Sequence, residues 1–197
     1  KAHPEAGPPL EWRLSADGEL QIRGGSPFLG YYRRESSVES KVKDGWFYTG
    51  DAVTKTELGE LVFLERLSDL KRLRSGETFP PQFVETRLRF SPFIKDIMTV
   101  GDETRDFVAA LINIDMSVLS RWAEDKRIGF STFTDLSQRP EIAELIGQEI
   151  ARVNQFLPAH ARVKRFANFP KELDPDEGEL TRSRKLRREF LEVRYAT

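Results

Sequence analysis

The feature that most constrains this 197-residue chain is a change of character between residues 65 and 85. The segment is rich in charged residues up to Arg74, then contains Gly76, and then the proline pair Pro80-Pro81. Proline is favoured in the first turn of a helix, where its missing N–H costs nothing. Short apolar runs and turn residues precede the segment, and longer strand-like and helix-like patterns follow it. The sequence therefore predicts a boundary between two structural parts, with a glycine loop just after the joint.

The first part, residues 1–68, is predicted to be rich in β-structure. The predicted strands span residues 10–14, 19–23, 46–48, 52–55 and 61–64. The first two strands flank Asp17-Gly18, a typical turn sequence, and are predicted to form a hairpin. Gly50 and Asp51 are predicted to form a turn between the third and fourth strands.

The second part, residues 69–197, is predicted to mix strands with helices. The predicted helices span residues 81–90, 116–122, 139–157 and 183–195, and the predicted strands span residues 94–100, 107–114 and 163–169. In the third helix, Ile142, Leu145 and Ile146 recur at the spacing of one helical face. The predicted fold class is therefore α+β: a β-rich N-terminal piece followed by a small α/β domain with a short central sheet flanked by helices.

The composition excludes several classes of function. The chain has no cysteine, which excludes disulfides and thiolate metal sites, and its two histidines argue against a His-rich metal site or a Ser-His-Asp triad. Lys and Arg number 31 against 32 Asp and Glu, so no global attraction to nucleic acid or membranes is expected. No apolar run approaches membrane-spanning length and no signal peptide is visible, so the expected location is cytoplasmic.

Three stretches carry a resemblance to a known family. Residues 45–51, Gly-Trp-Phe-Tyr-Thr-Gly-Asp, look like a (Y/H)TGD motif, and residues 178–188 look like a C-terminal lysine motif. Between them, the residues that resemble a hinge and its following loop are Arg66, Asp69, Lys71-Arg72, Gly76, Pro81 and Glu85. In this order and at about this spacing, the chain resembles the adenylate-forming enzymes, and among them most closely the long-chain fatty-acid–CoA ligases. Gly30-Tyr31-Tyr32 is similar to a further segment of the family's large domain.

The resemblance implies nucleotide-binding roles for Asp51 and Arg66. A carboxylate can accept two hydrogen bonds at once, which matches the two vicinal hydroxyls of a ribose. Relatives use these two positions to bind the ribose of the adenylate. The alternatives are a turn aspartate that satisfies its own backbone and an ordinary surface arginine.

The resemblance also implies roles for Asp69 and Gly76. In relatives, the aspartate is the hinge whose backbone rotation swings the small domain between two orientations. Gly76 belongs to the loop that then faces the CoA channel, where a residue without a Cβ lets a pantetheine arm pass close to the backbone. The alternatives are a linker aspartate and a turn glycine.

Lys185 lies in the most basic part of the chain, residues 182–188, which holds five cations. These residues fall in the first turn of the predicted last helix, where the helix dipole disfavours cations. A bound anion would explain their placement. The resemblance implies that Lys185 bridges the substrate carboxylate and the ATP phosphates during adenylation. Relatives often have proline and glycine where this chain has Arg182 and Arg184. The alternative is a solvated basic helix face.

The chain contains neither the Ser/Thr/Gly-rich phosphate loop nor the Tyr-Gly-x-Thr-Glu segment of such enzymes, and it opens without methionine. The expectation is therefore a C-terminal fragment: residues 1–68 as the end of the large domain and residues 69–197 as the mobile small domain. The full-length parent enzyme would activate a long-chain fatty acid with ATP and transfer the acyl group to CoA. The missing N-terminal domain would bind most of the ATP and Mg²⁺, this chain would hold no metal, and the fragment alone would be inactive.

Two alternatives stand beside this expectation. One is another adenylate-forming enzyme whose acyl acceptor is a carrier protein. The other is a non-enzymatic module whose basic residues 182–188 bind nucleic acid or an acidic partner. The balanced charge and the absence of stacking aromatics around that segment argue against nucleic acid. Peripheral membrane association of the parent and a homodimer are left open.

Overall fold

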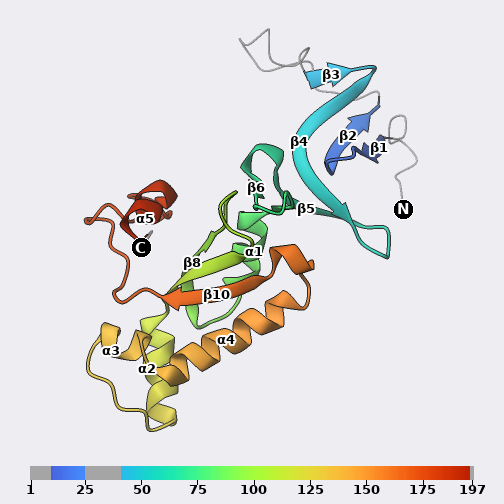
Figure 1. Ribbon diagram of the computed structural model, residues 1–197. Coiled ribbons are helices and arrows are strands. Elements are labelled where there is room, and N and C mark those ends of the chain that lie inside the picture. Colours follow the sequence, from blue (N-terminus) through green and yellow to red (C-terminus); the bar gives the residue numbers. More distant parts are fainter. Residues whose placement is uncertain (1–9, 25–40, 196–197) are drawn as a thin grey trace, which may run out of the picture. The chain divides into compact units, whose positions relative to one another are not determined.

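The computed structural model describes residues 10–24 and 41–195, which divide into two compact units, Lys1–Leu70 and Lys71–Thr197 (Figure 1). The junction predicted from the sequence, between residues 68 and 69, is two residues from this division. The Gly30-Tyr31-Tyr32 segment lies outside the described residues. The α+β class is confirmed, because strands dominate the first unit and both strands and helices build the second.

The first unit is a five-stranded antiparallel sheet. Its strands are β1 (Glu11–Leu14), β2 (Glu19–Arg23), β3 (Val42–Lys43), β4 (Trp46–Lys55) and β5 (Leu61–Arg66). Their order is β1-β2-β4-β3, and β5 also pairs with β4. The predicted hairpin of the first two strands is confirmed: Trp12 lies opposite Ile22, and Gly18 takes a positive φ of 80° in the turn.

Strand β4 corrects one prediction. Two strands separated by a turn at Gly50 and Asp51 were expected, but the chain continues as one strand from Trp46 to Lys55. The register against β2 moves from Gln21–Tyr48 to Glu19–Ala52, so β4 carries extra residues there. Such an insertion is a β-bulge, which bends the strand without ending it. Gly50 makes the bulge feasible, because its φ of 73° is one that other residues rarely adopt.

The second unit is built on a three-stranded mixed sheet, in the order β10-β9-β8. The strands are β8 (Ile94–Val100), β9 (Val108–Ile114) and β10 (Val163–Asn168). The helices are α1 (Pro81–Leu88), α2 (Met116–Asp125), α3 (Phe133–Ser137), α4 (Pro140–Asn154) and α5 (Arg188–Arg194). Figure 1 shows α4 running along β10. The parallel β9–β10 pair needs a long crossover, which α2, α3 and α4 provide.

The two faces of this sheet bury different clusters. Ile97 on β8 and Ile112 on β9 face the larger core, which α1 and α4 cover. Met98, which follows Ile97, and Leu111, which precedes Ile112, face a smaller cluster that includes Leu191 of α5. This alternation follows from the two-residue period of a strand. The sheet is therefore covered by helices on both faces, as predicted.

Several elements differ from the sequence-based prediction. The last helix begins at Arg188, not at residue 183, because residues 181–187 form a turn. The short helix α3 was not among the predicted helices. A two-stranded hairpin, β6 (Lys71–Arg72) with β7 (Thr78–Phe79), replaces the simple glycine loop after the junction. Within the described ranges, no helix has the length and apolar character needed to cross a membrane.

Candidate functional site

The bulge in β4 fixes the backbone around Asp51. The Gly50 N–H donates to the Glu19 carboxylate at 2.8 Å, and Glu19 is buried. The Thr49 hydroxyl donates to the Leu20 carbonyl at 2.7 Å and accepts from the Asp51 N–H at 3.1 Å. Contacts with β2 hold Thr49 and Gly50, and Thr49 in turn holds the Asp51 N–H, so the Asp51 backbone is positioned by the sheet and not by a free turn.

Asp51 and Arg66 lie opposite each other on β4 and β5. Arg66 Nη1 is 2.7 Å from Asp51 Oδ1 and donates to the Thr49 carbonyl at 3.1 Å. The Arg66 side chain is 59% exposed and that of Asp51 is 28% exposed. The two predicted nucleotide-binding residues are therefore brought together. Since one carboxylate oxygen faces the arginine and the side chain stays accessible, Asp51 can still accept hydrogen bonds from a ligand.

Asp69 and Gly76 flank the division between the units. Asp69 ends a 3-10 helix, η2 (Leu67–Asp69), and accepts a hydrogen bond from the Ser68 hydroxyl at 2.9 Å. Gly76 lies at the tip of the β6–β7 hairpin with a φ of 87°, and a Cβ there would meet nothing within 4 Å. The positive φ alone is a sufficient reason for glycine. The open space at the tip is compatible with the predicted CoA-channel role, which stays a prediction.

Lys185 is presented on a tight hairpin turn. The Thr181 N–H donates to the Lys185 carbonyl at 2.8 Å, and the Lys185 N–H donates to the Thr181 hydroxyl at 3.0 Å. Leu180 and Leu186, on either side, form an antiparallel bridge. The expectation of cations in the first turn of a helix is wrong for Lys185. Thr181 closes the turn before the helix begins, and the lysine side chain is exposed at the turn.

The buried carboxylate of Glu179 anchors the chain at the start of this turn. Glu179 has no exposed surface, and it accepts hydrogen bonds from Lys171 Nζ at 2.8 Å and the Tyr195 hydroxyl at 3.0 Å. Arg194 Nη1 is 3.5 Å from the same carboxylate. Burial would lower the pKa of Lys171, but hydrogen bonds and charges of Glu177 and Glu179 outweigh it and raise that pKa. The residue before the Leu180–Leu186 bridge is thus fixed by ionic contacts.

A second ionic contact ties the start of α5 to the rest of the unit. Arg188 pairs with Glu85 on α1 and donates to the Thr99 carbonyl on β8 at 3.4 Å. Glu85 also accepts hydrogen bonds from the Thr99 N–H and hydroxyl, both at 2.7 Å. Arg188 is therefore a structural residue and not part of a phosphate-facing surface. Both Arg188 and Glu85 belong to the motifs found in the sequence. Their pairing could not be predicted, because the two residues are 103 positions apart.

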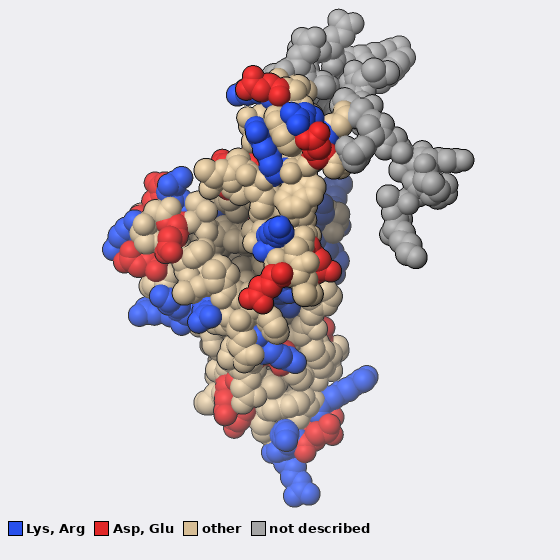
Figure 2. Space-filling model, turned by 90° about the vertical axis from the view of Figure 1, so that its right-hand side faces the viewer, with Lys and Arg blue, Asp and Glu red and all other residues tan. Residues whose placement is uncertain are grey.

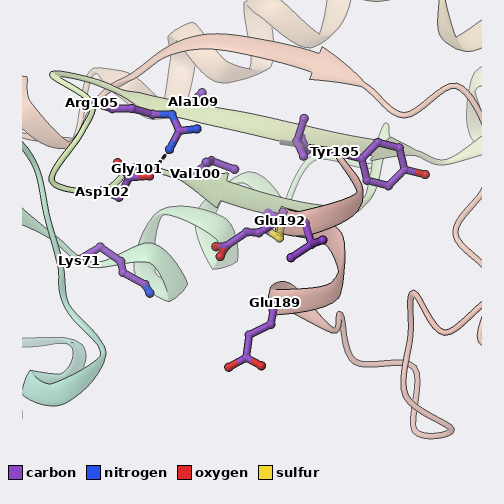
Figure 3. A pocket seen from close by; sticks show the side chains of 12 residues that line it. Lys71, Val100, Gly101, Asp102, Arg105, Ala109, Glu189, Glu192 and Tyr195 are labelled. Carbon is purple, nitrogen blue, oxygen red and sulfur yellow. Dashed lines mark hydrogen bonds and ion pairs between the residues drawn. The ribbon is translucent and has the colours of Figure 1, made fainter. Parts of the chain in front are cut away.

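A cavity of about 750 Å³ lies between the sheet and α5 (Figure 3). The sheet contributes apolar residues such as Met98 and Leu111, and Figure 3 shows Lys71 and Glu192 directed toward the space. None of the predicted site residues lines it. In the described part of the chain, no group of three or more His, Cys, Asp or Glu side chains could hold a metal ion.

Several solved structures share the fold of this chain. The adenylation domain of a carboxylate reductase from Mycobacterium chelonae matches with a TM-score of 0.61 and 21% identity, over 96% of this chain and 30% of that one. The anthranilate CoA ligase AuaEII, solved with anthranoyl-AMP, matches with a TM-score of 0.56 and 16% identity, over 93% of this chain and 33% of that one. At these identities the likeness establishes the fold, which is that of adenylate-forming enzymes.

The family follows from the sequence comparison. The model of the AMP-binding enzyme C-terminal domain matches residues 69–197, and the chain belongs to this family. The long-chain-fatty-acid–CoA ligase FadD15 of Mycobacterium tuberculosis is 30% identical over 94% of this chain and 31% of its own length. Long chain acyl-CoA synthetase 1 of Arabidopsis thaliana is 33% identical over 68% of this chain and 20% of its own length. The chain thus spans less than a third of these relatives.

Proposed function

We propose that this chain is the C-terminal portion of an ATP-dependent ligase that activates a long-chain fatty acid as an acyl adenylate and transfers the acyl group to CoA. The family match and the two curated relatives support this proposal. The observation that carries it is the placement of the predicted residues. The paired side chains of Asp51 and Arg66, which we propose bind the ribose, precede the division at residue 70, and the exposed Lys185 follows it on a hydrogen-bonded turn.

The chemistry assigned to these residues is electrostatic. In adenylation, a carboxylate oxygen of the fatty acid attacks the α-phosphorus of ATP, and the bond from that phosphorus to the bridging oxygen breaks. Asp51 and Arg66 hold the ribose, which fixes the position of the α-phosphorus. The Lys185 ammonium lies between the attacking carboxylate and the phosphates and offsets the negative charge that develops there. In thioester formation, rotation at Asp69 replaces Lys185 with the Gly76 hairpin.

Transfer to a carrier protein is the competing function. A solved neighbour of the fold is the A-PCP didomain of a carboxylic acid reductase from Segniliparus rugosus, at a TM-score of 0.61 and 18% identity. At 18% identity this match supports a shared fold only. The curated relatives, which are more similar in sequence, are CoA ligases. A nucleic-acid-binding module is disfavoured by the surface. On the face in Figure 2, basic and acidic side chains are interspersed instead of forming one basic field.

The first test compares the 197-residue chain with the longer protein that contains it. The measurement is ATP–pyrophosphate exchange in the presence of fatty acids of graded length. We expect no exchange by the chain alone and fatty-acid-dependent exchange by the longer protein, with Asp51→Ala raising its KM for ATP more than tenfold. An Asp17→Ala variant is the matched control, because Asp17 is an exposed turn aspartate with no proposed role. Exchange by the chain alone would contradict the proposal.

A further inference from the structure

The turn that carries Lys185 contains a backbone outlier. Arg184 has a φ of 59°, in the left-handed region that disfavours residues with a Cβ. Thr181 and Lys185 close a three-residue loop, Arg182-Ser183-Arg184, and the third residue of such hairpin loops is left-handed. Glycine would adopt this conformation without strain. The chain therefore keeps an arginine at a position where it is locally unfavourable.

Two other non-glycine residues with positive φ also lie in turns that require this conformation. Asp44 forms a two-residue hairpin turn with Gly45, and aspartate tolerates this conformation. Arg127 follows α2, where its N–H donates to the Glu124 carbonyl and the next N–H donates to the Ala123 carbonyl. These bonds form a Schellman motif, which requires a left-handed residue after the helix. Arg127 thus has the same residue type and φ as Arg184, at a position with no proposed catalytic role.

The side chain of Arg184 has no ionic partner in the described part of the chain. Arg182, Arg184 and Lys185 are all exposed, and no carboxylate there lies within ion-pair distance of them. By contrast, Arg188 and Arg194 are each paired with glutamates. Backbone strain persists where a surrounding structure imposes it, and such residues cluster at functional sites. Unpaired cations on a rigid turn suit a ligand that carries several negative charges.

We propose that Arg184 binds the β- and γ-phosphates of ATP next to Lys185 and stabilises the pyrophosphate as it leaves. This inference rests on the proposed function and deepens it. When the bond between the α-phosphorus and the bridging oxygen breaks, pyrophosphate departs with the electron pair. Its added charge is spread over oxygens that a planar guanidinium can bind in a bidentate manner. Lys185 serves the attacking side of the same phosphorus, and Arg184 serves the leaving side.

The direct test titrates the 197-residue chain with inorganic pyrophosphate at low ionic strength, followed by backbone amide NMR shifts of residues 180–186. We expect saturable shifts whose apparent Kd rises about tenfold in Arg184→Gly, the size of one charge-assisted hydrogen bond, and is unchanged in Arg127→Gly. Arg184→Lys should retain most of the binding. Absent shifts, or equal binding by Arg184→Gly, would overturn the proposal. This readout does not depend on whether the parent makes acyl-CoA.

The companion measurement separates fold from function. Both glycine variants remove a strained conformation and should raise the Tm by about 2 °C, since glycine's larger unfolded-state entropy offsets part of the gain. In the longer protein, Arg184→Gly should lower fatty-acid-dependent pyrophosphate exchange about tenfold without affecting thioester formation from preformed adenylate. Loss in the thioester step alone would instead assign Arg184 to CoA phosphates and overturn the proposal. Loss in neither step would also overturn it.

Discussion

Replacing Lys185 with alanine is expected to slow acyl-adenylate formation about 100- to 1,000-fold, the usual cost of losing one preorganised electrostatic contact to a transition state. The lysine is exposed on a turn fixed by Thr181 and by the Leu180–Leu186 bridge, so its ammonium is positioned without being neutralised. Thioester formation from preformed adenylate should change less than threefold, because the role we propose for the ammonium is confined to the first half-reaction. The measurement is pre-steady-state quantification of both half-reactions in the longer protein.

The control for this variant is Lys126→Ala. Lys126 is also an exposed lysine, at the C-cap of α2, and it has no proposed role. Its replacement should leave both half-reactions unchanged. An equal loss in the two half-reactions of Lys185→Ala would contradict the assigned role, since it would indicate a defect in binding or folding.

Replacing Glu179 with alanine is expected to lower the free energy of unfolding of the second unit by about 3 kcal/mol, as is typical when one partner of a buried ion pair is removed. The carboxylate is fully buried and contacts Lys171, Arg194 and Tyr195. Without it, the Tyr195 hydroxyl loses its hydrogen-bond partner, and the Lys171 ammonium keeps only its contact with Glu177. The expected loss is at the lower end of the range for a broken buried ion pair. The reason is that Lys171 and Arg194 are 32% and 40% exposed and can turn toward water.

Hydrogen exchange of the β8 and β9 amides measures this effect, because core strands open with the whole unit. The matched control is Glu172→Ala, which removes an exposed glutamate paired with Lys95 and should cost less than about 1 kcal/mol. Glu179→Gln keeps the shape and loses the charge, so it should fall between the two. A cost for Glu179→Ala no larger than that of Glu172→Ala would mean that the buried network does not support the Lys185 turn.

The parts of the fold with strong periodicity could be predicted from the sequence. The hairpin of β1 and β2 follows from alternating runs around Asp17-Gly18, and α4 follows from apolar residues at helical spacing. Both depend on neighbours within a few residues.

The local conformations at the site were not predictable, because distant residues determine them. The bulge at Gly50 depends on the Glu19 carboxylate, 31 residues earlier. The last helix was predicted to begin at residue 183, but burial of Leu180 against Met98 and Leu191 favours a hairpin turn there instead. The strain at Arg184 is a consequence of that turn. The sequence therefore identified the candidate residues, and the structure was needed to find how each side chain is presented.

The central claim is that a ribose-binding carboxylate and a phosphate-binding lysine are carried by two bodies that rotate about Asp69. These 197 residues contain no cysteine, so spin labels at Glu57→Cys and Lys126→Cys need no further change within them, and any cysteine elsewhere in the longer protein is first replaced by serine. Pulsed EPR on the longer protein measures the distance between them with acyl adenylate bound and again with CoA added. We predict two separate distances whose populations exchange between these conditions, and a single distance in Asp69→Pro. One narrow distance, unchanged in both conditions in the protein that retains Asp69, would contradict the claim.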